Sequence, residues 1–210
     1  CPTEVLQAQA RAMVNHRGVE FADLLGRVTQ RLKQVFQTSG DVFALTCSGT
    51  GAMEAIVVNT LSPGDRVLAL PCGFFGERFA ELAQVYGADV VRLEFPWGSA
   101  VDPDKVRQAL HKDPSIKAIQ IVHNETSTGV TNPLKDIAAL AREFDKLLLV
   151  DAVSSLSSLD LPMDAWGCDA VATASQKGFM TPPGLGLVGM GPRAWEANAR
   201  AKMPRCYLDL

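Results

Sequence analysis

The chain lacks any pairing pattern among its cysteines. There are five in 210 residues, an odd number, and no two form a C-x-x-C pair: Cys1, Cys47, Cys72, Cys168 and Cys206. This spacing indicates neither a disulfide framework nor a zinc site, so we expect no bound metal. Scattered free thiols are typical of a reducing compartment, and we therefore expect a cytoplasmic location.

An excess of positive charge and a long apolar run are also lacking. The 20 Lys and Arg and 23 Asp and Glu give a formal net charge of −3, which supplies no basic stripe for the phosphates of a nucleic acid. The longest uncharged run, 178–192, is interrupted by Gly and Pro and is too short to span a bilayer as a helix. The first residues show no basic and apolar signal segment. We expect neither nucleic acid nor membrane as a partner.

What the chain does contain is a regular alternation of two patterns. Apolar residues make up 47% of it, enough to bury a core. An amphipathic helix predicted at 19–37 would cover one face of a sheet. Strands are then predicted at 42–46, 66–70, 90–94, 116–122, 146–150, 170–174 and 186–190, and helices at 51–61, 76–86, 103–112 and 133–144. This order predicts an α/β fold: a mainly parallel sheet with helices on both faces, in three αβα layers.

Five loops with polar, small or aromatic residues follow predicted strands. They are 46–50, 71–76, 123–129, 151–154 and 175–178. In open sheets of this kind, ligands bind beyond the carboxyl ends of the strands, where such loops meet. We therefore expect the five loops to surround one binding crevice.

Three of these loops each allow two interpretations. Ser48-Gly49-Thr50-Gly51 would present free N–H groups to a phosphate at a helix start, or would be an ordinary N-cap with a tight turn. It lacks the glycine pattern of dinucleotide sites and the Gly-Lys-Ser/Thr of a P-loop. Phe74 or Phe75 could stack on a flat ring or belong to the core. His123 could be a hydrogen-bonded structural histidine or a base.

Lys177 and Asp151 form the most informative pair. Lys177 follows the predicted strand 170–174, and Asp151 ends the predicted strand before it. Taken singly, a lysine there is usually a solvated charge and an aspartate a cap or turn former. Together they offer an amine for an aldehyde and a carboxylate for a ring nitrogen, which is what pyridoxal phosphate (PLP) chemistry requires.

The ordered motifs resemble those of the class V aminotransferases, and within them the alanine/serine–glyoxylate branch. The residues that carry the resemblance are Ser48-Gly49-Thr50-Gly51, Gly73-Phe74-Phe75-Gly76, 123–129 (HNETSTG), 151–155 (DAVSS) and Ser175-Gln176-Lys177-Gly178. The interval of 26 residues from Asp151 to Lys177 (177 − 151) matches as well. The resemblance extends over nearly the whole chain and implies the large domain of PLP fold type I.

The resemblance implies a role for each of nine residues. Lys177 would form the internal aldimine with PLP and later move a proton between the substrate Cα and the cofactor C4′, and Asp151 would pair with the pyridinium nitrogen. Phe75 and Val153 would contact opposite faces of the ring, and Thr126 would hydrogen-bond the ring hydroxyl. The phosphate would be bound by Ser48, Gly49, Thr50 and Gln176.

The resemblance also implies the domain organisation. Residues 1–40 would be an N-terminal helical segment packing on the large domain, 41–203 the PLP-binding large domain, and 204–210 the start of a connection. Family members continue there into a smaller C-terminal domain with the arginine that clamps the substrate carboxylate, and we expect this domain to be absent from this chain. Family members are homodimers, so a homodimer is expected.

The expected function is a PLP-dependent transaminase. It would move an amino group from serine or alanine to glyoxylate or a similar small 2-oxo acid. Two alternatives stay open: another class V enzyme, such as a lyase or a cysteine desulfurase, and a non-catalytic accessory subunit. A desulfurase often has a histidine where Gln176 stands, and it needs a reactive cysteine on a mobile loop.

Overall fold

A seven-stranded sheet forms the centre of the computed structural model, which describes all 210 residues. Its strand order is β1-β9-β8-β7-β4-β2-β3. The strands are β1 (Asp41–Leu45), β2 (Arg66–Ala69), β3 (Asp89–Arg92), β4 (Ala118–Val122), β7 (Leu147–Asp151), β8 (Ala170–Ala174) and β9 (Gly186–Met190). Every residue of β4, β7, β8 and β9 is buried, as expected for strands covered on both faces.

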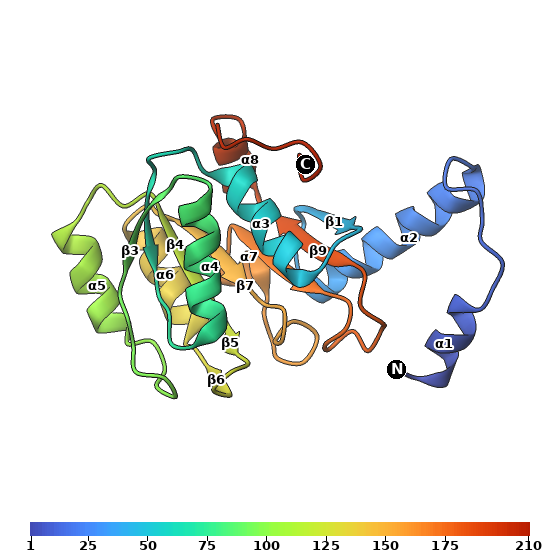
Figure 1. Ribbon diagram of the computed structural model, residues 1–210, viewed down its shortest axis with the longest axis horizontal. Helices are drawn as coiled ribbons and strands as arrows, with labels where there is room; N and C mark the ends of the chain where they lie inside the picture. The colour runs from blue at the N-terminus through green and yellow to red at the C-terminus, as the bar shows by residue number, and fades with distance from the viewer.

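Helices cover both faces of this sheet, as the sequence predicts. One face packs on α3 (Gly49–Thr60), α4 (Phe74–Val85) and α8 (Pro192–Asn198). The other packs on α5 (Pro103–Lys112), α6 (Leu134–Glu143), α7 (Met163–Trp166) and the end of α2 (Val19–Phe36). Figure 1 shows these layers. The predicted α/β architecture with a mainly parallel sheet is thus confirmed.

One strand of the sheet runs against the others. β9 pairs antiparallel with both β8 and β1, whereas the pairs β8–β7, β7–β4, β4–β2 and β2–β3 are parallel. Because β1 and β8 flank β9 and both oppose it, their carboxyl ends lie at the same edge. The loops after β1, β2, β4, β7 and β8 therefore meet there, as the sequence predicts.

Several short elements are absent from the sequence prediction. The polar stretch after β4 forms a hairpin of β5 (Asn124–Glu125) and β6 (Val130–Thr131) instead of a plain loop. The helices α7 and α8 were also not predicted, and α1 (Thr3–Gln9) lies in the predicted N-terminal helical segment 1–40 but was not predicted as a separate helix. These elements are two to seven residues long, too short for periodicity to show. None of the helices combines the length and the apolar character needed to cross a membrane.

The N-terminal helices extend away from the sheet. In Figure 1, α1 and most of α2 project to one side of the molecule. Only Leu32 and Phe36 of α2 are buried, while Leu24, Leu25 and Val28 are 41%, 43% and 37% exposed. The expectation that the helix at 19–37 covers a sheet face therefore holds only for its last turns. Most of its apolar face has no partner within the chain.

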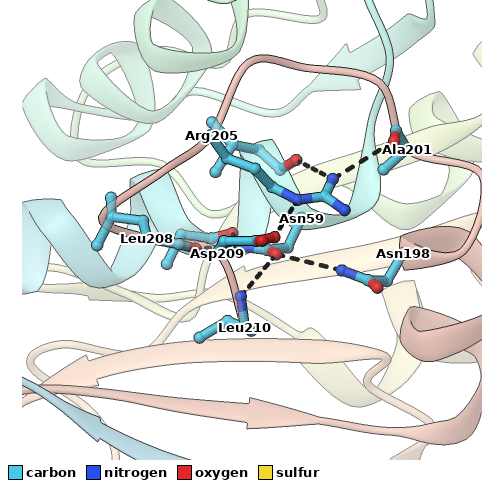
Figure 2. A network of polar contacts seen from close by, with 9 residues as sticks. Asn59, Asn198, Ala201, Arg205, Leu208, Asp209 and Leu210 are labelled. Carbon is cyan, nitrogen blue, oxygen red and sulfur yellow. Dashed lines mark hydrogen bonds and ion pairs between the residues drawn. The ribbon is translucent and has the colours of Figure 1, made fainter.

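The last residues of the chain are attached to α3. Asn59, fully buried on α3, donates to the carbonyls of Ala55 (2.9 Å) and Leu208 (2.6 Å). Its Oδ1 accepts from Asn198 Nδ2 and from the Leu210 N–H, each at 3.2 Å. Figure 2 shows this network, in which Arg205 also bonds to Asp209 and to the carbonyl of Ala201. Residues 205–210 are thereby held against the C-terminal half of α3.

Candidate functional site

A cavity of about 220 Å³ opens at the carboxyl edge of the sheet. All nine residues proposed from the sequence line it: Ser48, Gly49, Thr50, Phe75, Thr126, Asp151, Val153, Gln176 and Lys177. They come from five separate loops, which the parallel strands bring to one edge. The cavity is also lined by Met53, Val122, Asn124 and Ser154, which the sequence analysis did not single out.

The start of α3 forms one wall of the cavity. Ser48 is the N-cap, and its hydroxyl accepts from the Gly51 N–H at 3.3 Å. A Cβ on Gly49 would lie 2.8 Å from Val153 Cγ2 and 3.2 Å from Ala174 Cβ, so only glycine lets the helix start this close to the strand ends. The N-cap interpretation of this loop is thus confirmed. The cap leaves further N–H groups of the first turn free, so a phosphate site here stays a prediction.

Asp151 lies at the end of β7 and is only 2% exposed. Its carboxylate accepts from the Val153 N–H at 2.8 Å and takes part in no ion pair. Burial raises the pKa of Asp151 to about 7; the Val153 hydrogen bond opposes this rise, and the nearby charge of Glu125 adds to it. A buried carboxylate without a cation is a costly arrangement that a cationic ligand group would relieve.

Lys177 lies in the loop that joins β8 to β9. Its side chain is exposed toward the cavity and forms no ion pair. Buried Ser175 closes the base of this loop: its N–H donates to the Leu185 carbonyl (3.0 Å) and its hydroxyl to the Pro182 carbonyl (2.7 Å). Thr181 Oγ1 donates back to the Ser175 carbonyl at 2.8 Å. The amine therefore extends from a loop that is fixed at both ends.

The two phenylalanines of the loop after β2 take different positions. Phe75 is half-buried and lines the cavity, while Phe74 is 50% exposed beside it, with ring centroids 5.3 Å apart in an edge-to-face arrangement. Neither belongs to the buried core clusters. The structure therefore favours the ring-contact interpretation of Phe75 over the core interpretation.

His123 lies outside the cavity. It is 4% exposed, packs edge-to-face on Trp166 with ring centroids 6.0 Å apart, and its Nδ1 has no hydrogen-bond partner. Burial lowers its pKa to about 4. A neutral ring away from the cavity speaks against the interpretation as a base, and the hydrogen bond expected of a structural histidine is missing at Nδ1.

Two side chains that the sequence analysis missed, Asn124 and Ser154, hold two loops of the cavity together. Asn124 Nδ2 donates to Ser154 Oγ (3.0 Å), and Ser154 Oγ donates to the Asn124 carbonyl (2.8 Å), which ties the loop after β4 to the loop after β7. Both residues lie within loops already assigned to the crevice. That location was the only sequence signal available for them.

A larger groove of about 610 Å³ lies at the opposite edge of the sheet. Its charged residues are of both signs, and two of its cations are paired, Lys117 with Asp65 and Arg193 with Asp145. It contains none of the candidate residues. We therefore take the smaller cavity as the candidate site, where a buried carboxylate, an amine and a helix start converge.

Comparisons with known proteins agree on one family. A family profile described as "Aminotransferase class-V" matches residues 3–202. The "Soluble hydrogenase 42 kDa subunit" of Anabaena cylindrica is 49% identical over 100% of this chain and 55% of its own length. The "L-aspartate--glyoxylate aminotransferase" of Paracoccus denitrificans is 42% identical over 100% of this chain and 54% of its own length.

A solved structure shows the same fold. The alanine–glyoxylate aminotransferase of Nostoc sp. superimposes with a TM-score of 0.94 at 39% identity, covering 98% of this chain and 55% of that one. The chain thus spans about half the length of the relatives it matches.

Proposed function

The chain belongs to the class V aminotransferase family, whose members use PLP, and from this premise we propose that it carries the cofactor site of a transaminase. The amino donor would be serine or alanine, and the acceptor glyoxylate or a similar small 2-oxo acid. The names of the aminotransferase relatives support this substrate class. The single observation that carries the proposal is the convergence of Lys177 and Asp151 on one cavity.

The residues of the cavity fit PLP. A phosphate group suits the start of α3, where Ser48 and Gly49 leave backbone N–H groups facing the cavity. A protonated ring nitrogen suits Asp151. Burial raises the pKa of this carboxyl because a charge is costly there, and a neighbouring cation would offset that cost. Half-buried Phe75 and Val153 offer apolar surface for a flat ring.

PLP supplies an electron sink that stabilises negative charge at the substrate Cα. In the proposal, Asp151 keeps the ring nitrogen protonated so that this sink is available. Lys177 Nζ provides the amine that bonds the cofactor and afterwards carries the proton to and from the substrate. Thr126 and Gln176 would hold the ring hydroxyl and the phosphate.

The substrate carboxylate needs a further group. No arginine lines the cavity, and the class V pattern places the clamping arginine in a C-terminal domain. The division into 1–40, 41–203 and 204–210 remains part of the proposal. We also propose that the protein is a cytoplasmic homodimer that binds small amino acids and 2-oxo acids. The exposed apolar face of α2 supports the dimer.

Replacing the lysine tests this function. Lys177→Ala should abolish the visible absorption band of bound PLP and its trapping by borohydride, because no other amine lines the cavity. Lys135→Ala, exposed on α6, is the matched control and should keep both. An unchanged band in Lys177→Ala would refute the assignment.

A second candidate is a non-catalytic accessory subunit. It is favoured by one observation, the 49% identical relative that is named as a soluble hydrogenase subunit. Both candidates predict PLP binding. Incubation of the complete protein with serine and glyoxylate separates them, since only a transaminase would form glycine.

A further inference from the structure

The first turn of α4 is capped by a residue from another loop. Its own N-cap is Gly73, which has no side chain to accept from the free N–H groups. Glu125 of the β5–β6 hairpin does so instead. Its Oε2 accepts from the Gly76 N–H at 3.0 Å, and its Oε1 accepts from the Phe75 N–H at 3.4 Å.

This cap is buried and closely packed. Glu125 is 0% exposed, and its Oε1 also accepts from the N–H (3.1 Å) and the hydroxyl (2.7 Å) of Ser127. Ser127 Oγ in turn accepts from the Phe74 N–H at 3.0 Å. A Cβ on Gly73 would lie 2.5 Å from Glu125 Cγ, so glycine is required for this approach. The two loops therefore form one hydrogen-bonded unit.

We propose that Glu125 is a positioning residue, which fixes the Phe75 ring at the wall of the cavity and thereby sets how firmly the cofactor ring is held. The inference rests on the proposed function, because it assigns Phe75 to the cofactor ring. The backbone N–H groups of Phe75 and Gly76, on either side of the Phe75 side chain, both donate to the Glu125 carboxylate. Rotation of the first turn of α4 would break both bonds at once, so the ring direction depends on Glu125.

Two other roles for Glu125 would look different in experiment. As a purely structural cap, it would stabilise the fold without a specific link to Phe75. As an electrostatic neighbour, it would act on the cofactor through Asp151, whose carboxyl senses its charge. Only the positioning role makes the effect of Glu125 on PLP depend on the presence of the Phe75 ring.

A double-mutant cycle in the complete protein distinguishes these roles. Glu125→Gln replaces one accepting oxygen by an NH₂ donor that faces a backbone N–H, and we expect the Kd for PLP to rise about tenfold. Phe75→Leu should raise it by a similar factor. In the Phe75→Leu background, Glu125→Gln should add less than about twofold, because coupled residues are non-additive. The circular dichroism of bound PLP should weaken in both single variants.

Ser127→Ala provides a second, milder variant in case Glu125→Gln fails to fold. It removes the hydroxyl between Oε1 and the Phe74 N–H but leaves the carboxylate, so we expect a smaller rise in Kd, again only when Phe75 is present. Additive effects on Kd for both variants would overturn the inference while leaving the proposed function intact. A wild-type protein that does not bind PLP would overturn both.

Discussion

Two buried titratable side chains respond to burial in opposite directions. Asp151 is held protonated up to about pH 7, and His123 is held neutral down to about pH 4. Both shifts follow from the cost of a buried charge. Between these pH values, the two groups change the free energy of unfolding with pH in opposite directions. Substituting one residue at a time separates the two contributions.

Asp151→Asn should stabilise the PLP-free protein at pH 8. The folded state keeps the Asp151 proton up to about pH 7, whereas the unfolded state loses it near 3.8. The folded state thus binds more protons in this window, so stability is present at low pH and is lost as the pH rises. The variant should regain up to about 4 kcal/mol at pH 8, measured by urea unfolding. Asp23→Asn, exposed on α2, should change nothing, and equal stability of wild type and Asp151→Asn would contradict the prediction.

In the complete protein, the same variant should lose the proposed transaminase activity, measured as glycine formed from glyoxylate. Without the carboxylate, the ring nitrogen would not stay protonated, and the electron sink would weaken. A gain in stability combined with a loss of activity is the mark of a residue kept for chemistry rather than for folding.

His123→Phe should reduce the sensitivity of the fold to acid. The unfolded state binds a proton at this histidine near pH 6.5 and the folded state near 4, so stability falls as the pH drops through that window, by about 3 kcal/mol in total. The comparison is best made in the Asp151→Asn background, where the opposing slope is gone. Urea unfolding should show that the free energy of unfolding falls less between pH 6.5 and 4 in the variant with His123→Phe than in the protein that keeps His123. His16→Gln, an exposed control, should keep the original slope; a slope unchanged by His123→Phe would rule the account out.

Sequence reasoning reached the cavity residues because each lies just after a strand, where the fold class directs side chains to one edge. It could not find the capping role of Glu125. An acidic residue in a polar loop is usually solvated, and the reason for the burial of Glu125 is its bond to Gly76, in a helix start 49 residues earlier in the chain. Contacts of that range depend on how two loops meet, which no local pattern encodes.

At the scale of elements, α3 joins the cavity to the end of the chain. Its first turn lies at the cavity, and Asn59 near its last turn holds residues 208 and 210. The helix is almost wholly buried between these two points. Residues 208 and 210 are thus attached to the helix that would hold the cofactor phosphate.

Asn59→Ala should destabilise the protein by about 2–3 kcal/mol. It removes four hydrogen bonds and leaves the Leu208 carbonyl and the Leu210 N–H without their partner. Asn198→Ala, which removes one of the four, should cost about 1 kcal/mol or less. Urea unfolding measures both. Equal losses in the two variants would argue against a special role for Asn59.

The long elements were predicted to within a few residues, because apolar periodicity marks them clearly. The direction of β9 was not indicated by its sequence. A run of buried apolar residues looks the same in either direction, and only the connection to its neighbour decides. The unpacked part of α2 was missed for a similar reason: an amphipathic face shows that a partner exists, not whether the partner belongs to the same chain.

At the scale of the whole molecule, the exposed face of α2 leads to a prediction about assembly. Replacing Leu24 and Val28 together by Glu should convert the proposed homodimer to a monomer at micromolar concentration, because charges would replace an apolar contact. Gln30→Glu adds a charge to the same helix and should leave the dimer intact. Sedimentation velocity distinguishes the two states, and a wild type that is already monomeric would disprove the proposed dimer.

The reversed direction of β9 has a consequence for how this protein can change. Since β8 leaves the sheet and β9 re-enters it at one edge, residues 176–184 form a closed excursion pinned by Ser175 at its neck. Insertions at 183–184, beyond Lys177 and beyond the Thr181 and Pro182 contacts that close the neck, would lengthen this excursion without displacing any strand. The surroundings of the Lys177 amine can therefore change in length and shape while the sheet beneath them stays the same.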